Sequence, residues 1–349
     1  MAFRNQVSSF AQSIPDDLWQ IPPMNQLAWL KYFKNLKPDH GFLSWLVTHF
    51  NPPTMVFRFE DSTVTPTYEE MCAVLDHHPE QDETPALPRG PRYDLAEIVA
   101  LCPVYLPNGI STDQGLPLEP FLSRVMSMDI DPSWIRACCF LLLNTYALKN
   151  CQPGIRDFQL LTVVRDMQIH HRTVFMMIMG ETMCWVRDIA LHITNFNVHH
   201  RGCPMLLQTW ALDKLSLILS VLAHLIPTYG PANFRPRTRG HFDFGDNPTI
   251  RWTCPWWRIR LVTTGSMNLN YVLHASLDRS IAYFPDRISR QYGMIQCLPR
   301  IHNFESGLMT QRLLTSLADR WRNRNTRNLG RGVIQDTVTP EYVNWFFSP

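Results

Sequence analysis

Histidine and cysteine are the first residues to consider for chemistry in this sequence, because both types bind metals. His199 and His200 precede Cys203 by four and three residues. A tetrahedral zinc site needs further ligands at suitable spacing, and no C-x-x-C or H-x₃-H pair lies nearby to supply them. The nine cysteines are odd in number and several lie inside apolar runs, which is typical of free thiols in a reducing compartment. We therefore predict no metal site and an intracellular protein.

The motifs that accompany common catalytic mechanisms are missing from the sequence. Ser266 follows a glycine, but the run TTGSMN lacks the G-x-S-x-G elbow of serine hydrolases. No phosphate-binding G-x-x-x-x-G-K-[ST], no G-x-G-x-x-G and no H-E-x-x-H is present. Of the five lysines, only Lys149 and Lys214 lie outside one N-terminal helix, and neither has the β-rich context of a pyridoxal-phosphate lysine. We predict no catalytic residue, no cofactor and no enzymatic activity.

A basic segment near the carboxyl end is the candidate contact for nucleic acid. Residues 312–331 hold six arginines against one acid, and a tryptophan lies among them. Arginine with an aromatic residue suits phosphate contacts and base stacking. The candidate residues are Arg320, Trp321, Arg322 and Arg324. The alternative is a solvated helix end, where cations complement the helix dipole.

A long loop over residues 228–256 is the candidate contact for a protein partner. Loops of this length are often functional, and Trp, Tyr and Arg are the residue types enriched at binding hot spots. The candidate residues are Arg235, Arg237, Arg239, Trp252, Trp256 and Trp257. The alternative is that the tryptophans fold back onto the core. A second loop, residues 76–92, is rich in proline and acidic residues and is expected to be exposed.

Composition limits the class of protein to which this chain can belong. Of its 349 residues 45% are hydrophobic and only 18% charged, so most of the chain must fold around a core. No apolar stretch reaches the ~18 residues of a membrane span. The net charge is +2, yet residues 1–150 hold ten Lys/Arg against 17 Asp/Glu and residues 251–349 hold 13 against six. This gradient fits an acidic partner at the carboxyl-terminal third, or attraction between the chain's own ends.

Prolines divide the sequence into short helical segments. Twenty-seven prolines against 15 glycines indicate stiff breaks rather than flexible linkers. Helical signals are found at residues 25–37, 39–50, 67–75, 93–101, 118–128, 131–148, 156–168, 171–194, 203–226, 268–284, 286–292, 307–324 and after Thr339-Pro340. No βαβ alternation and no repeat is present, so the pattern predicts a mainly α protein.

Two helix starts and one hairpin are the strongest local signals. Thr67 and Glu70 form a capping box. Asp131 caps a run that is almost entirely apolar, which predicts a buried central helix. Residues 55–60 alternate as a strand does and are followed by a second short strand over 62–65.

These elements predict a mainly α fold, a multi-helix globular domain with a small N-terminal β-hairpin. We divide the chain into an N-terminal helical segment, residues 1–54, and a helical domain, residues 55–349, into which the two loops are inserted.

Five segments, in this order, resemble those of the plant mobile domain family, whose members include the MAINTENANCE OF MERISTEMS proteins and are also described as aminotransferase-like. The segments are FRFEDSTVTPTYEEMCAVL, RACCFLLLNTYAL, RGCPMLLQTWALDKL, DRISRQYGMIQCLP and TPEYVNWF. They span residues 57–347, so the resemblance covers most of the chain.

The residues that match the family motifs read physically as packing residues. Buried tryptophan and leucine normally form core, and a glycine after a helix is a common cap. The motif residues are Gly202, Cys203, Leu207, Gln208, Trp210, Arg290, Gln291, Tyr292, Gly293 and Pro299.

The resemblance implies a nuclear, non-catalytic protein-interaction module. Such modules, some of them derived from transposons, act in transposon and gene silencing, gene-expression control, meristem maintenance and genome stability. The implied partner is a protein, among them a phosphoprotein-phosphatase-like protein, and not a membrane. A transposon-derived nucleic-acid-binding factor that uses residues 312–331 is the alternative function.

Overall fold

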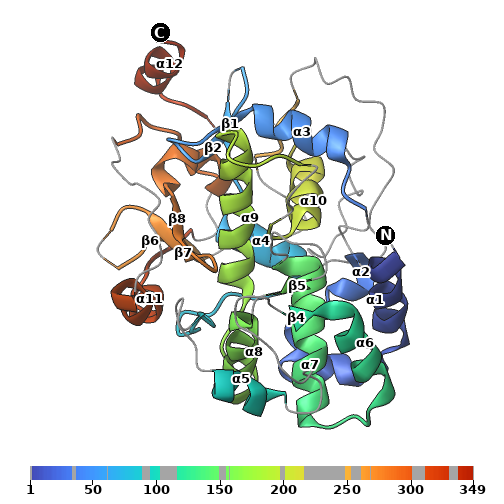
Figure 1. The fold of residues 1–349 in the computed structure, drawn as a ribbon. Coiled ribbons are helices and arrows are strands. Elements are labelled where there is room, and N and C mark those ends of the chain that lie inside the picture. Colours follow the sequence, from blue (N-terminus) through green and yellow to red (C-terminus); the bar gives the residue numbers. More distant parts are fainter. Residues whose placement is uncertain are drawn as a thin grey trace.

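The computed structural model shows a mainly helical chain with small antiparallel sheets, as the sequence predicts (Figure 1). It describes residues 2–33, 37–60, 62–88, 95–102, 116–148, 155–156, 158–196, 201–215, 248–252, 261–267, 269–300, 311–329 and 337–348.

The helices follow from the amino to the carboxyl end. They are α1 (Ala2–Ser13), η1 (Leu18–Gln20), η2 (Met24–Leu27), α2 (Leu30–Phe33), α3 (His40–Thr48), α4 (Tyr68–Leu75), α5 (Leu95–Leu101), α6 (Leu118–Ser127), α7 (Pro132–Leu142), η3 (Leu143–Ala147), α8 (Gln159–Ile169), α9 (Phe175–Ala190), α10 (Pro204–Lys214), η5 (Pro285–Tyr292), α11 (Gln311–Arg322) and α12 (Pro340–Phe347). The strands are β1 (Phe50–Asn51), β2 (Val56–Arg58), β3 (Thr63–Val64), β4 (Leu116–Pro117), β5 (Ile155–Arg156), β6 (Leu261–Gly265), β7 (Val272–Ala275), β8 (Ser280–Tyr283) and β9 (Asn325–Asn328).

Helix α9 runs through the middle of the molecule and packs against β7, β8, α3 and α4 (Figure 1). Fourteen of its 16 residues are buried, including four methionines, whose flexible side chains fill irregular gaps. The helix approaches β7 so closely that a Cβ on Gly180 would lie 2.1 Å from the carbonyl oxygen of Ala275. This contact fixes the spacing between the central helix and the sheet.

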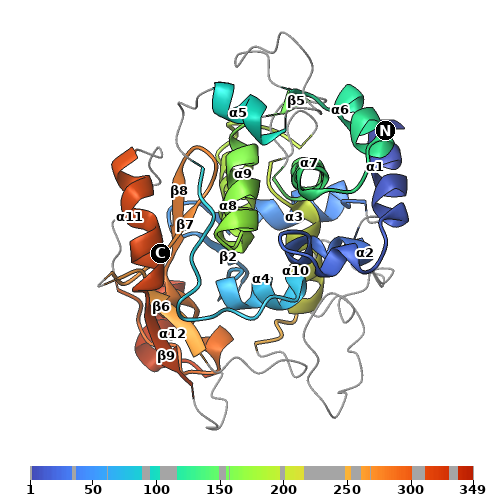
Figure 2. The same cartoon turned by 90° about the horizontal axis from the view of Figure 1, so that it is seen from below.

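Helices α6, α7 and α1 lie on the side of α9 opposite β7, β8 and α11 (Figure 2). Helix α7 begins as predicted, with the Asp131 carboxylate accepting a hydrogen bond from the Trp134 N–H. It is buried, as expected, but α9 and not α7 occupies the centre. Helix α1 was not predicted, because apolar residues are sparse in its sequence; its Val7, Phe10 and Ala11 nevertheless join the core.

A small sheet and a capped helix follow α3. Strands β1, β2 and β3 form an antiparallel sheet in that order, so β1 joins the two strands expected from the sequence. Helix α4 starts with the predicted capping box, in which Thr67 accepts from the Glu70 N–H and the Glu70 carboxylate accepts from the Thr67 N–H. All eight residues of α4 are buried.

The helix predicted for residues 268–284 is wrong. The chain forms β7 and β8 instead, paired antiparallel from Val272 with Tyr283 to Ala275 with Ser280. All eight residues of the two strands are buried, so they read as a continuous apolar run rather than an alternating one. Periodicity alone does not separate such strands from a buried helix.

No helix within the described ranges has both the length and the apolar character needed to cross a membrane.

Replacement of Gly180 by alanine is expected to lower the free energy of unfolding by about 3 kcal/mol, the upper end of the cost of overpacking. The clash with β7 outweighs the helix-propensity gain of about 1 kcal/mol. Gly41→Ala in α3 is the matched control, because its Cβ would meet nothing closer than 3.4 Å. Urea denaturation of both variants checks the contact, and a Gly180→Ala protein as stable as Gly41→Ala would contradict it.

Candidate functional site

The Glu70 carboxylate is the centre of a buried polar network. Lys214 Nζ donates to Glu70 Oε1 at 2.7 Å, and Trp210 Nε1 donates to Oε2 at 2.8 Å. Gln291 Nε2 donates to Oε2 at 3.1 Å and to the carbonyl of Thr65 at 2.9 Å. Four segments of the chain, the turn before α4, α4 itself, α10 and η5, therefore meet at one charge.

The network explains two of the family-motif residues. Trp210 and Gln291 lie 81 positions apart in the sequence, yet both donate to the same carboxylate. A buried ion pair is costly to break, because removal of one partner leaves an uncompensated charge. The neighbouring Glu69 accepts from the Thr263 N–H at 2.7 Å, and burial raises the pKa of its carboxyl.

Four further motif residues lie at the start of α10. Gly202 has φ +61°, and a Cβ there would lie 2.5 Å from the backbone of Thr182. The Cys203 N–H donates to Thr182 Oγ1 at 2.9 Å. Leu207 is buried, and Gln208 accepts from the backbone N–H of the residue that caps α3, at 2.7 Å. These residues join α10 to α9 and α3.

The remaining motif residues lie at the end of η5. The Arg290 guanidinium lies 3.6 Å from the ring centroid of Trp252. Tyr292 is buried, Gly293 ends η5 at φ +70°, and Pro299 is buried. All these positions serve packing between elements rather than a reaction.

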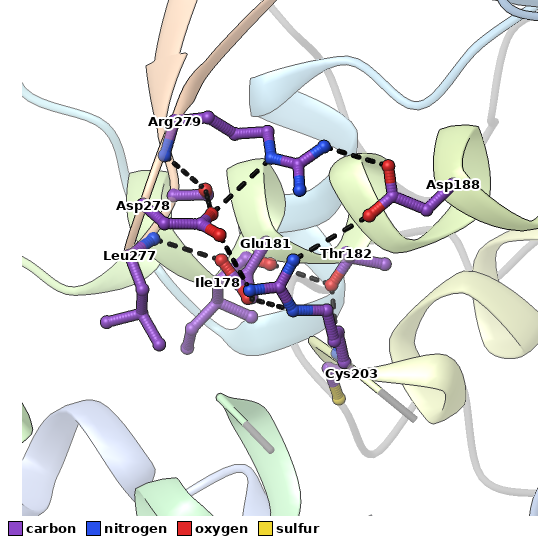
Figure 3. A network of polar contacts seen from close by, with 10 residues as sticks. Ile178, Glu181, Thr182, Asp188, Cys203, Leu277, Asp278 and Arg279 are labelled. Carbon is purple, nitrogen blue, oxygen red and sulfur yellow. Dashed lines mark hydrogen bonds and ion pairs between the residues drawn. The ribbon is translucent and has the colours of Figure 1, made fainter. Parts of the chain in front are cut away.

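Ion pairs hold α9 to the turn between β7 and β8. Arg201 lies 3.4 Å from Glu181, 3.6 Å from Asp188 and 2.9 Å from Asp278. Arg279 pairs with Asp188 at 2.8 Å, and the two side chains face each other across α9 and the turn (Figure 3). Burial raises the pKa of Glu181 despite the nearby Arg201. For Asp278 burial also acts to raise the pKa, but attraction to Arg201 outweighs it and the pKa is lowered.

The predicted nucleic-acid contact does not hold for Trp321 and Arg324. Trp321 is 1% exposed and its Nε1 donates to Glu83 Oε1 at 3.2 Å. Arg324 is also buried, donates to the carbonyls of Glu80 and Gln81, and lies 4.5 Å from the Trp321 ring centroid. Neither side chain is available for base stacking or phosphate contact.

The other two residues of that candidate contact face outward. Arg320 is half-buried, and Arg322 is exposed and pairs with Asp319 at 2.9 Å. An exposed pair of this kind contributes little to stability. Half of the positive charge predicted for a nucleic-acid surface is therefore used inside the fold.

The loop over residues 76–92 is only partly exposed, which corrects the prediction for it. Glu83 is buried and accepts from Tyr68 Oη at 2.7 Å, and it pairs with His77 at 2.7 Å. Residues 85–88 are buried as well. The acidic residue was expected in solvent, but it instead supplies the acceptor for Trp321.

The second loop, residues 228–256, lies largely outside the described residues, as do the candidate residues Arg235, Arg237, Arg239, Trp256 and Trp257. Trp252 is described: it is half-buried and packs against the core, and its carbonyl accepts from Lys214 at 3.0 Å.

Helix α12 carries an exposed apolar surface at the outer end of the molecule (Figure 1). Tyr342 and Phe346 are buried, whereas Val343, Trp345 and Phe347 are 39%, 44% and 60% exposed. At about 100° per residue, Val343 and Phe347 lie to one side of the buried pair and Trp345 lies to the other. We call the three exposed residues the α12 surface.

A pocket of about 220 Å³ lies beside Trp345, between α12, the β1–β3 sheet and η5. Arg58 Nη2 donates to the Phe346 carbonyl at 2.7 Å, and its guanidinium lies 4.5 Å from the Phe346 ring centroid. Thr63 Oγ1 lies 3.4 Å from Tyr342 Oη. The pocket is lined by Asn51, Thr54, Val56, Arg58, Thr63, Arg287, Pro299, Tyr342, Trp345, Phe346 and Ser348.

Sequence reasoning did not identify the pocket or the α12 surface. One signal was available: five of the eight residues of α12 are large and apolar, and a helix that packs on one side buries only part of so wide an arc. The pocket itself joins residues 51–63 to residues 287–348, and such a meeting is not readable from local patterns.

His274 on β7 is a buried imidazole without a hydrogen-bond partner on either ring nitrogen. Its ring stacks on Tyr283 at 5.4 Å and on Tyr68 at 6.0 Å between centroids. Burial lowers its pKa to about 3, so the folded protein holds it neutral. Within the described part of the chain no group of three or more potential ligands could hold a metal ion.

Comparison of the chain with protein-family models, with curated proteins and with solved structures gives no match.

Trp210→Ala is expected to lower the free energy of unfolding by about 3–5 kcal/mol, as truncation of a large core aromatic does. The variant also removes a donor from the buried Glu70 carboxylate. Gln208→Ala on the same helix is the control, with an expected loss of about 1 kcal/mol for one hydrogen bond. Equal unfolding midpoints for the two variants would show that Trp210 is not part of the core.

Acid is expected to destabilise the protein through His274. Below pH 6.5 the unfolded chain takes up a proton at this residue, whereas the folded protein does so only near pH 3. Stability therefore falls as the pH drops below 6.5 and is unaffected by this group above it. Between pH 7 and 5 the wild type should lose about 2 kcal/mol more than His274→Phe. Urea titrations at both pH values measure this difference, and equal losses would refute it.

Proposed function

We propose that this chain is a non-catalytic protein-interaction module of the plant mobile domain type. In this proposal it works in the nucleus, in transposon silencing, gene-expression control and genome stability of dividing cells. The five motifs that resemble the family support the type of module, and they imply a partner such as a phosphoprotein-phosphatase-like protein. The α12 surface is the observation that supports the interaction role.

The α12 surface has the composition of a protein contact. It places a tryptophan and a phenylalanine in solvent on one helix, and exposed apolar groups that lie together mark interaction sites. Tryptophan is among the residues enriched at binding hot spots. Met126, Ile130 and Ile193 are comparably exposed, but they are not aromatic and do not line the pocket beside α12.

The positions of the titratable groups favour binding over catalysis. Glu69, Glu181 and His274 have shifted pKa values, but all three are buried in the core. The pocket beside α12 is lined by arginines, hydroxyls and apolar groups, with no carboxylate or imidazole among its described lining. A general base next to a reacting group is a common requirement of acid–base catalysis. The burial of Trp321 and Arg324 removes support from the nucleic-acid alternative.

The double variant Trp345→Ser/Phe347→Ser is expected to lose at least about 80% of the proteins that co-purify with the wild type from plant nuclear extract, because hot-spot aromatics supply most of the binding energy. Met126→Ser/Ile130→Ser is the matched control, since it removes equally exposed apolar groups elsewhere. Quantitative mass spectrometry of the purified complexes measures the loss.

Two outcomes would contradict the proposal. In the first, both double variants retain the same partners as the wild type. In the second, the wild type retains nothing beyond the tag alone. Circular dichroism and the unfolding midpoint show whether each variant is folded.

A further inference from the structure

The pocket beside α12 holds two guanidinium groups and no counter-ion. Arg58 and Arg287 line it from β2 and η5, and none of its lining residues is acidic. No ion pair joins either arginine to a described carboxylate. Two positive charges thus face one small cavity without neutralisation from the protein.

Arg287 is the more buried of the two arginines. It is half-buried beneath the pocket, and its Nε has no hydrogen-bond partner. Burial lowers the pKa of its guanidinium, although Asp286 and Tyr342 act in the opposite direction. A cation that is partly removed from water and unpaired gains most from an incoming anion.

Arg58 and the neutral groups complete a set of donors. Arg58 uses Nη2 for the Phe346 carbonyl, and a guanidinium has five N–H donors, so others remain for a ligand. Burial raises the pKa of Tyr342, which keeps its hydroxyl protonated at neutral pH. The amide of Asn51 and the hydroxyl of Thr63 line the same space. This combination suits a carboxylate or a phosphate.

The size of the pocket limits what it holds. Sites for whole small-molecule ligands span about 300–1,000 Å³, and this pocket has about 220 Å³. It therefore accommodates a single anionic group rather than a complete cofactor. The group must also be attached to something apolar, because Trp345 at the rim leads onto the α12 surface.

We propose that the pocket binds an anionic side chain, a glutamate, aspartate or phosphorylated residue, of a partner peptide whose neighbouring apolar residues lie on the α12 surface. This inference rests on the proposed function, because it names the chemistry of the partner for that same surface. A peptide fits better than a lipid bilayer, because the half-buried Arg287 lies at the base of a cavity of single-side-chain size rather than on an exposed plane.

Fluorescence anisotropy with labelled peptide pools tests the inference on the full 349-residue chain. The nine-residue peptides carry glutamate, phosphoserine or glutamine at the centre, and mixtures of leucine, phenylalanine, alanine and serine elsewhere. We expect at least one anionic pool to bind about tenfold more tightly than the glutamine pool, as charge-assisted hydrogen bonds imply. The glutamate and phosphoserine pools show which source of the anion is preferred.

Variants assign the preference to the pocket. Arg287→Gln should abolish it while the affinity for the glutamine pool stays unchanged. Arg58→Gln is the second variant, in case the first does not fold. Trp345→Ser should weaken binding of all three pools. Arg322→Gln removes one exposed charge on α11, far from the pocket in sequence and outside its lining, and should change nothing.

Several results would overturn the inference. They are equal binding of the three pools, binding of none, a preference that Arg322→Gln reduces as much as Arg287→Gln does, and binding to phosphatidylserine vesicles without a peptide preference, which would indicate a membrane surface. Binding that depends on Trp345 but not on charge would refute the anion pocket alone and leave the proposed function standing. Binding unaffected by Trp345→Ser would count against the α12 surface itself.

Discussion

The requirement to satisfy the buried Glu70 carboxylate governs how the distant parts of this chain meet. A charge removed from water must be paired and hydrogen-bonded, or the protein pays several kcal/mol. Here the donors come from α10, through Trp210 and Lys214, and from η5, through Gln291. Because η5 also carries Arg287, four residues before Gln291, the same carboxylate that orders the core fixes one wall of the pocket beside α12.

Two other polar clusters repeat this arrangement at different places. Glu83 collects donors from Tyr68, His77 and Trp321, and so attaches α11 to the start of α4. The Arg201 cluster attaches the start of α10 to α9 and to the turn between β7 and β8. Polar groups of this kind specify which elements meet, whereas apolar packing alone tolerates many arrangements. The fold is thus apolar in bulk and polar at its junctions.

Local signals predicted the local structure well. The capping box of Thr67 and Glu70 and the Asp131 cap depend only on residues within one turn, and both are present. Signals that depend on distant contacts were misread: residues 268–284 became strands because α9 covers them, and Trp321 is buried because Glu83 accepts its hydrogen bond. The pocket could not be predicted, because the residues that line it lie up to 297 positions apart.

The hydrogen bond from Arg58 to the Phe346 carbonyl makes occupancy of the pocket and order of the last helical turn a linked equilibrium. An anion that draws the guanidinium toward itself competes with that carbonyl, whereas one that binds the remaining N–H groups strengthens the attachment. By thermodynamic reciprocity, whatever the anion does to the end of α12, the state of α12 does to the affinity for the anion. Amide hydrogen exchange at the end of α12 is therefore a direct gauge of the sign of this coupling.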